Sequence, residues 1–194
     1  MKKIKLKKNH KEKSNRWLKR HLNDSFYQEA KKSGLRSRSA FKLLQINEKF
    51  NFFFKGARII DLGAAPGGWS QVAKKLSGPD GTVLGLDLLS IEPINGIKFL
   101  EGDINDFKIH SQIKSHLNDK VDIILSDMAP NTSGHSQTDH LRIVNLAELA
   151  VNFSEIFLKK DGFFVCKVFQ GGAQGKLLEF MKNTLKDMKY MNPP

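Results

Sequence analysis

Cysteine is almost absent from the sequence, since Cys166 is the only one among 194 residues. No disulfide framework can form within the chain, which favours a reducing compartment, and we expect the protein in the cytoplasm. No apolar run approaches the roughly 18 residues that a membrane span needs, so we expect no membrane segment. The six histidines form neither an HExxH motif nor a cluster with the cysteine. We therefore expect no metal site.

Acidic residues are scarce in the first 42 residues, which contain three acidic and 15 basic side chains. The rest of the chain is balanced, so this segment carries the entire net charge of +12. Aromatic residues such as Trp17 and Phe41 are interleaved with the charge. Such a segment is typical of binding to a polyanion whose counterions are displaced, which favours nucleic acid. A solubilising tail, an anionic membrane and a mitochondrial presequence are weaker alternatives.

Three segments are expected within a single domain overall: a disordered basic arm at 1–13, a helical RNA-binding extension at 14–50 and the main domain at 51–194. The extension is expected to contain helices at 14–33 and 37–50, separated by Ser33-Gly34.

Short apolar runs alternate with helical patterns in the main domain, which indicates an α/β fold. These runs are apolar nearly throughout, as in a parallel sheet covered by helices on both faces. We expect a Rossmann-like, doubly wound and mostly parallel sheet with ligands at the carboxyl ends of its strands. The expected strands are 57–62, 82–87, 97–100, 121–126 and 162–169, and the expected helices are 69–76, 139–158 and 174–188.

A loop of small residues, Asp61-Leu62-Gly63-Ala64-Ala65-Pro66-Gly67-Gly68-Trp69, follows the first expected strand. Small residues let the backbone approach a ligand closely, and the following helix offers free N–H groups. Asp61 can bind an amine, Asp87 at the end of the next strand can accept ribose hydroxyls, and Asp103 can bind an adenine amino group.

The three acids favour S-adenosylmethionine as the cofactor, because it carries an amine, a sulfonium and a ribose but no phosphate. Asp61 would repel the pyrophosphate of NAD, which is a weaker alternative, as is an ordinary tight turn with solvated acids. The chain has no Walker lysine motif, which excludes a P-loop.

Asp127 and Lys167 are expected at the ends of two further strands. A lysine within the apolar segment 163–169 must be desolvated, paired or at the mouth of a site, although it can also snorkel from a strand end. Methyl transfer to a ribose hydroxyl needs a base, and Lys167 is the candidate, oriented by Asp127. Lys42 is a candidate for a second cation near that base, but read alone it is a solvated helix residue.

Together these motifs resemble the FtsJ/RrmJ (RlmE) family of large-subunit ribosomal RNA methyltransferases, from about residue 14 to the end. The loop Asp61–Trp69 combined with Ser126-Asp127-Met128-Ala129-Pro130-Asn131 is the most specific part of this resemblance. The other matching segments are 36–43, Leu86-Asp87, Asp103 and 166–171.

The resemblance implies a Rossmann-like methyltransferase fold for residues 51–194. It also implies S-adenosylmethionine-dependent 2′-O-methylation of a uridine in large-subunit ribosomal RNA, either free or in an assembled subunit. The implied catalytic residues are Lys167 as base, Asp127 and Lys42. The implied cofactor contacts are Gly67, Trp69, Asp87, Asp103 and Asp127, to which the residue pattern adds Asp61 and Gly63. A non-catalytic RNA- or ribosome-binding relative and a transfer RNA methyltransferase are the alternatives.

One departure from the family pattern concerns the end of the sequence. The family has a further catalytic glutamate in a C-terminal strand pair, after a Lys-Pro-x-x-Ser-Arg-type stretch. This sequence ends at Pro194, where that stretch would begin. We therefore expect a sheet without the final strand pair, in a sequence that is either truncated or a shortened variant.

Overall fold

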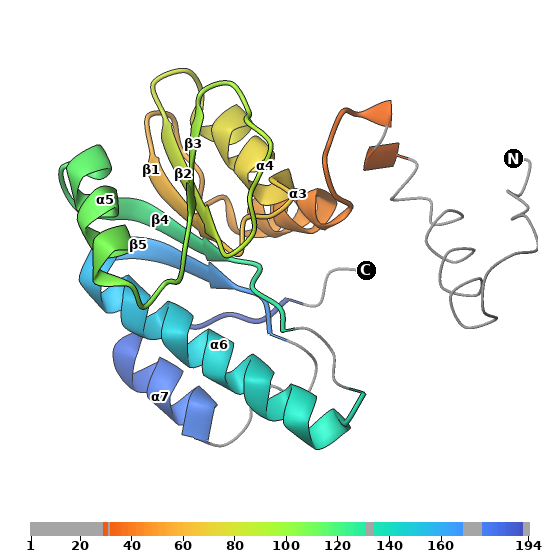
Figure 1. Cartoon of the computed structure of the whole chain (residues 1–194), viewed down its shortest axis with the longest axis vertical. Coiled ribbons are helices and arrows are strands. Elements are labelled where there is room, and N and C mark those ends of the chain that lie inside the picture. The colour runs from red at the N-terminus through yellow and green to blue at the C-terminus, as the bar shows by residue number, and fades with distance from the viewer. Residues whose placement is uncertain (1–28, 31, 131–133, 169–175, 192–194) are drawn as a thin grey trace, which may run out of the picture.

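The computed structural model describes residues 29–30, 32–130, 134–168 and 176–191 (Figure 1). The expected arm at 1–13 and most of the expected helix at 14–33 lie outside these residues. The described elements are α3 (Ser39–Phe50), β1 (Arg58–Leu62), α4 (Gly68–Ser77), β2 (Thr82–Asp87), β3 (Ile97–Glu101), α5 (Phe107–Leu117), β4 (Val121–Ser126), α6 (Ser136–Phe157), β5 (Leu158–Cys166) and α7 (Lys176–Thr184).

The described strands form one five-stranded sheet in the order β3-β2-β1-β4-β5, and every pair is parallel. The chain builds outward from β1 to β2 and β3, then returns to the other side of β1 for β4 and β5. The reversal creates a topological switch point between β1 and β4. In doubly wound folds ligands bind in a crevice at such a point, and we call the region that follows β1, β2 and β4 the crevice. The expected doubly wound fold is confirmed.

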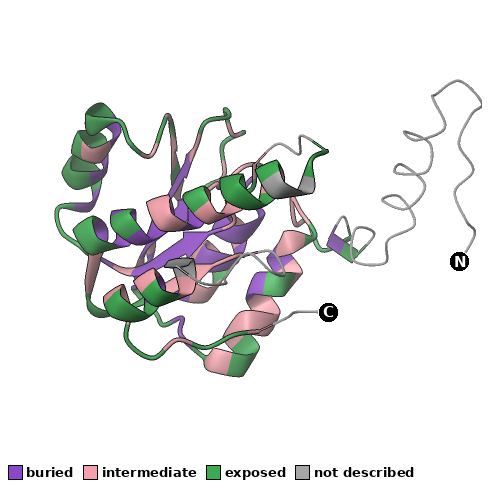
Figure 2. Ribbon diagram, turned by 90° about the horizontal axis from the view of Figure 1, so that it is seen from below, coloured by how far each residue is buried: buried purple, intermediate pink, exposed green. Residues whose placement is uncertain are grey.

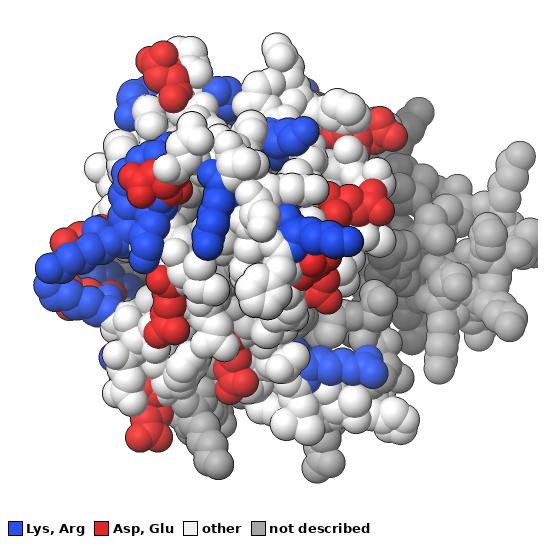
Figure 3. Space-filling model, turned by 60° about the vertical axis from the view of Figure 1, so that its left-hand side comes forward, with Lys and Arg blue, Asp and Glu red and all other residues white. Residues whose placement is uncertain are grey.

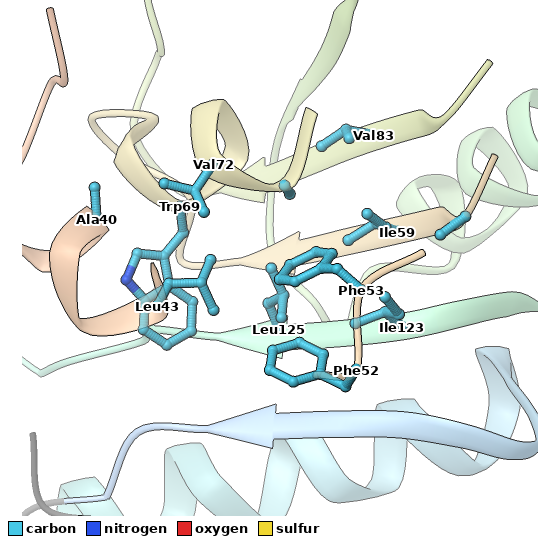
Figure 4. Close-up of a cluster of buried hydrophobic side chains, with 12 residues drawn as sticks. Ala40, Leu43, Phe52, Phe53, Ile59, Trp69, Val72, Val83, Ile123 and Leu125 are labelled. Atoms are coloured by element: carbon cyan, nitrogen blue, oxygen red, sulfur yellow. The ribbon is translucent and has the colours of Figure 1, made fainter. Parts of the chain in front are cut away.

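Helices cover both faces of the sheet, and the central strands β1, β2 and β4 are the most buried part of the fold (Figure 2). On one face, α3 and α4 pack on β1, β2 and β4 through the cluster drawn in Figure 4, which includes Leu43, Trp69 and Ile123. On the other face, α5 and α6 pack through a second cluster that includes Ile113 and Phe153. Because α3 shares a core with the sheet, residues 39–50 are part of the main fold.

Helix α5 was not expected from the sequence. The Asp106 side chain caps its start by accepting a hydrogen bond from the Lys108 N–H at 2.8 Å. Ile109, Ile113 and Leu117 then recur every four residues and are all buried. Polar residues between them obscure the apolar face, which explains why the pattern was missed.

The expected strand at 162–169 was wrong in its limits, since β5 runs from Leu158 to Cys166. Its first part is irregular: Val121 pairs with Leu158 but Ile123 with Phe163, and Asp161 has a φ of 63°. The Lys-Lys-Asp-Gly sequence there has a turn-like composition, so the sequence indicated a later start. Because β5 ends at Cys166, Lys167 lies one residue beyond the strand. Smaller shifts affect the other expected elements, since the helices at 37–50, 139–158 and 174–188 are Ser39–Phe50, Ser136–Phe157 and Lys176–Thr184.

The amino ends of the strands carry an ion-pair cluster around Asp122. Its carboxylate accepts hydrogen bonds from the Arg58 N–H at 2.8 Å and from the Lys159 ammonium at 2.5 Å. Burial opposes ionisation of Asp122, but these bonds outweigh it and keep the Asp122 pKa below its usual value. Arg58 also contacts Asp119, at 3.5 Å. The charged side chains of this cluster at the amino ends of the strands therefore have partners within the fold.

Charges of both signs are interspersed over the face shown in Figure 3, in agreement with the balanced composition after residue 42. The part of the chain that the structure describes contains no helix long and apolar enough to cross a membrane.

Candidate active site

The turn from β1 to α4 is built for close backbone packing. Gly63 donates its N–H to the Leu86 carbonyl at 2.9 Å, and its φ is 70°. A Cβ on Gly63 would lie 2.8 Å from the main chain of Met128, which follows β4. Gly67 precedes α4 with a φ of 106°. A side chain at either glycine would be strained, and the turn therefore keeps its backbone close to the crevice.

Asp61 is fully buried at the base of this turn. Its Oδ2 accepts a hydrogen bond from the Ser70 hydroxyl at 2.6 Å, whereas its Oδ1 has no partner among the described residues. Burial raises the pKa of Asp61 from 3.8 to about 7, and the charges of Asp127 and Asp87 add to the effect while Ser70 opposes it. Buried carboxylate oxygens are normally hydrogen-bonded, so the free oxygen indicates a place for a cationic donor.

The Asp87 carboxylate is oriented by the loops on either side of it. One oxygen accepts from the Ala65 N–H and the other from the Leu89 N–H, both at 2.9 Å. Each oxygen retains a second lone pair for a ligand hydroxyl. Asp103, after β3, is exposed and accepts from the Asn105 N–H at 2.8 Å. Asp87 ends β2 and Asp103 follows the adjacent strand β3, so both acids lie at the carboxyl edge of the sheet.

Lys167 and Asp127 form an ion pair immediately after β5 and β4. The Lys167 ammonium donates to the Asp127 carboxylate and also to the Asp127 main-chain carbonyl, at 3.1 Å. Both side chains are partly buried, with 29% and 15% of their surface exposed. The side chain of Lys167 therefore lies at the carboxyl edge of the sheet, neither free in solvent nor enclosed in the core.

Trp69 and Lys42 differ in how they relate to the crevice. The Trp69 indole is buried in the α3–α4 cluster and donates to the Ser39 carbonyl at 2.9 Å, so this side chain fixes α3 against α4 (Figure 4). Lys42 is exposed on α3. In the described part of the chain, no hydrogen bond or ion pair joins Lys42 to Asp127 or Lys167.

Two side chains that organise the site were not predicted from the sequence. Ser70 is the hydrogen-bond partner of Asp61 in the first turn of α4, and no pattern in the sequence links the two. Arg36 joins the loops after β1 and β2; it belongs to the segment 36–43, but that resemblance gave it no role. Among the described residues, no three His, Cys, Asp or Glu side chains are grouped as a metal site.

Comparison with known proteins identifies close relatives. Residues 35–194 match the family described as FtsJ-like methyltransferase. A protein named ribosomal RNA large subunit methyltransferase E from Acidiphilium cryptum is 47% identical over 190 residues, which cover 98% of this chain and 84% of the relative. A protein of the same name from Granulibacter bethesdensis is 48% identical over 180 residues, covering 93% and 77%.

A similar solved structure is described as a ribosomal RNA methyltransferase from Plasmodium falciparum. Its TM-score is 0.70 at 29% sequence identity, with 76% of this chain and 86% of the other covered. The similarity therefore extends over most of the described fold.

Proposed function

Because the chain belongs to the FtsJ-like methyltransferase family, we propose that it transfers a methyl group from S-adenosylmethionine to the 2′-hydroxyl of a uridine in large-subunit ribosomal RNA. The names of relatives at 44–48% identity support ribosomal RNA as the substrate. The observation that carries the chemistry is the Lys167–Asp127 pair beside the turn after β1. The protein would act in the cytoplasm, on free RNA or an assembled subunit.

The crevice fits the cofactor in three respects. The unpartnered oxygen of buried Asp61 can accept from the ammonium of the methionine part. Asp87 retains lone pairs that can accept from ribose hydroxyls, and exposed Asp103 can bind the adenine amino group. The backbone at Gly63 and Gly67 can approach the ligand closely. When bound, S-adenosylmethionine supplies a methyl group on a sulfonium: an oxygen nucleophile would bond to the methyl carbon while the carbon–sulfur bond breaks and the neutral thioether leaves.

Lys167 is the proposed base for the ribose hydroxyl. It must be uncharged when the hydroxyl enters, and its Nζ then takes the proton as the oxygen attacks. Asp127 orients Nζ through its carboxylate and carbonyl before transfer and stabilises the ammonium that results. Lys42, on α3, is proposed to stabilise negative charge developing on the ribose oxygen. The basic first 42 residues are proposed to bind the phosphate backbone.

A methylation assay with nucleoside analysis tests this proposal. The purified chain is incubated with labelled S-adenosylmethionine and, separately, isolated large subunits, protein-free ribosomal RNA and transfer RNA. The expected product is 2′-O-methyluridine from the ribosomal substrates. Label in transfer RNA alone would favour the transfer RNA alternative, and cofactor and RNA binding without product would favour a non-catalytic relative.

Two lysine variants provide a matched comparison. Lys159 and Lys167 both extend from the region of β5 and both pair with an aspartate of the β4 region, but at opposite ends of the strands. Lys167→Ala should abolish product formation, whereas Lys159→Ala should retain it. Equal losses in the two variants would indicate a stability effect and contradict the assignment of Lys167.

A further inference from the structure

Arg36 links three separate segments at the edge of the crevice. Its guanidinium donates to the carbonyl of Pro66, at 3.2 Å, in the turn after β1. It also donates to the carbonyls of Glu92, at 2.5 Å, and Pro93, at 2.9 Å, in the loop after β2. These two loops are far apart in sequence from Arg36, and one planar group joins them.

The main chain around Arg36 is itself fixed to α4. The Arg36 N–H donates to the Gln71 side chain at 2.8 Å, and Gln71 in turn donates to the Gly34 carbonyl at 3.1 Å. Close packing adds to these bonds, because a Cβ on Gly67 would lie 2.9 Å from Ile94 and 3.4 Å from the Arg36 side chain. Arg36 is thus anchored at its backbone and its guanidinium.

The two loops that Arg36 joins are the same two that orient Asp87. One carboxylate oxygen of Asp87 accepts from Ala65, next to Pro66, and the other from Leu89, in the loop that leads to Glu92. Displacement of either loop would rotate the carboxylate. The position of Asp87 therefore depends on a guanidinium that does not contact it directly.

The geometry points to Arg36 as a positioning residue that holds Asp87 in the orientation required for the ribose of the cofactor. This inference rests on the proposed role of Asp87 toward S-adenosylmethionine. Lysine cannot replace arginine in this role, because an ammonium on a flexible stem does not reach three carbonyls of two loops with a fixed planar fork. Replacement of Arg36 by lysine should lower the affinity for the cofactor more than the maximal rate.

Binding measurements on the full chain test the inference. Arg36→Lys should weaken the binding of S-adenosylmethionine and S-adenosylhomocysteine by about tenfold in calorimetric titrations. Arg58→Lys is the matched control, since Arg58 also donates to a backbone carbonyl, that of Leu117 at 3.2 Å, but at the opposite edge of the sheet. In methylation assays Arg36→Lys should raise KM for the cofactor while kcat at saturation stays within about twofold.

A double-mutant cycle separates action through Asp87 from an independent effect. If Arg36 acts by orienting Asp87, Arg36→Lys should cost less than about twofold in affinity when Asp87→Ala is already present. If the fold-losses in affinity of the two single variants multiply in the double variant, the inference is wrong. Lower RNA affinity with unchanged cofactor affinity would overturn it as well, and would make Arg36 an RNA contact.

A third measurement does not depend on the cofactor. In the ligand-free protein, Arg36→Lys should accelerate hydrogen exchange at the Ala65 and Leu89 amides, which donate to Asp87. Arg58→Lys should leave these amides unchanged. Unaltered exchange in Arg36→Lys would contradict the inference even if the protein binds no S-adenosylmethionine, a result that would separately contradict the proposed function.

Discussion

Lys167 donates to Asp127 twice, through the carboxylate and through the main-chain carbonyl. The two residues follow adjacent parallel strands, and their own N–H groups continue the sheet: Asp127 donates to Leu62 at 3.0 Å and Lys167 to Ser126 at 2.8 Å. The ammonium is therefore positioned by backbone of β1, β4 and β5 together. If Lys167 is the base proposed above, this backbone support should keep it in place when RNA binds.

The first prediction concerns the proton transfer. Lys167→Arg retains a cation that can pair with Asp127, but a guanidinium does not act as a base in proteins. Single-turnover methylation should fall by at least about 100-fold, while cofactor affinity changes little, since the role is confined to the transition state. Rapid-quench assays at saturating cofactor measure the rate, with Lys159→Arg as control. Activity within a few fold of wild type would assign the base to another group.

The second prediction concerns the ribose of the cofactor. Asp87→Ala should weaken S-adenosylmethionine binding by about 1.5–3 kcal/mol, the usual value for hydrogen bonds to a charged group. Asp119→Ala, which removes an exposed carboxylate near the amino edge of the sheet, should leave affinity unchanged. Isothermal titration calorimetry gives both values, and equal affinities in the two variants would argue against Asp87 as a ligand.

The third prediction concerns the stability of the ligand-free protein as a function of pH. The folded protein holds the Asp61 proton up to about pH 7, whereas the unfolded chain releases it near 3.8. Between these values the unfolded state binds fewer protons, so the Asp61 contribution to the free energy of unfolding falls as pH rises, by at most about 1.4 kcal/mol per pH unit.

Asp61→Asn removes this dependence, because its amide does not titrate. Urea unfolding is measured at pH values of about 4.5, 6 and 7.5. The free energy of unfolding of the variant minus that of the wild type should increase as pH rises. Other titrating groups are common to both proteins and cancel in the difference. A difference that is constant across this range would mean that Asp61 titrates near its ordinary value.

The fourth prediction concerns the first 13 residues, which lie outside the described part of the chain. Their removal deletes seven lysines. The log–log dependence of RNA affinity on salt should flatten by several units, because each phosphate contact contributes about 0.9 on duplex and about 0.7 on single strands. Fluorescence anisotropy with a ribosomal RNA fragment measures the slope. An unchanged slope would exclude contact between these lysines and phosphate.

The fold was predictable from the sequence where apolar runs are continuous and bounded by turn residues. The strands Thr82–Asp87 and Val121–Ser126 have the expected limits because their burial leaves one interpretation of the pattern. Helix α5 was not predicted, because polar residues interrupt its apolar face. The start of β5 was misplaced, because the irregular pairing around Asp161 depends on contacts with β4. Local patterns carry no information on such pairing.

In the candidate site too, some features follow from the local sequence and others depend on tertiary contacts. Parallel strands place their carboxyl ends together, so the strand assignments alone predicted Asp61, Asp87 and Asp103 around the cofactor, with Asp127 and Lys167 near them. The Trp69–Ser39 bond and the Arg36 contacts with carbonyls 30 and 56 residues away depend on how helices and loops pack in three dimensions. Backbone carbonyls occur at every position, so the sequence does not indicate which of them an arginine selects.

The unpartnered oxygen of Asp61 has a consequence for how long the protein survives in the cell. Oδ1 of Asp61 has no hydrogen-bond donor among the described residues, which destabilises the ligand-free fold, and the binding free energy of an ammonium there would add to stability. Differences of about 1–2 kcal/mol in stability alter the abundance of a protein several-fold through proteolysis of its unfolded form. We therefore expect slower turnover of this protein when its methyl donor is plentiful, so that supply of the donor controls the amount of enzyme as well as its rate.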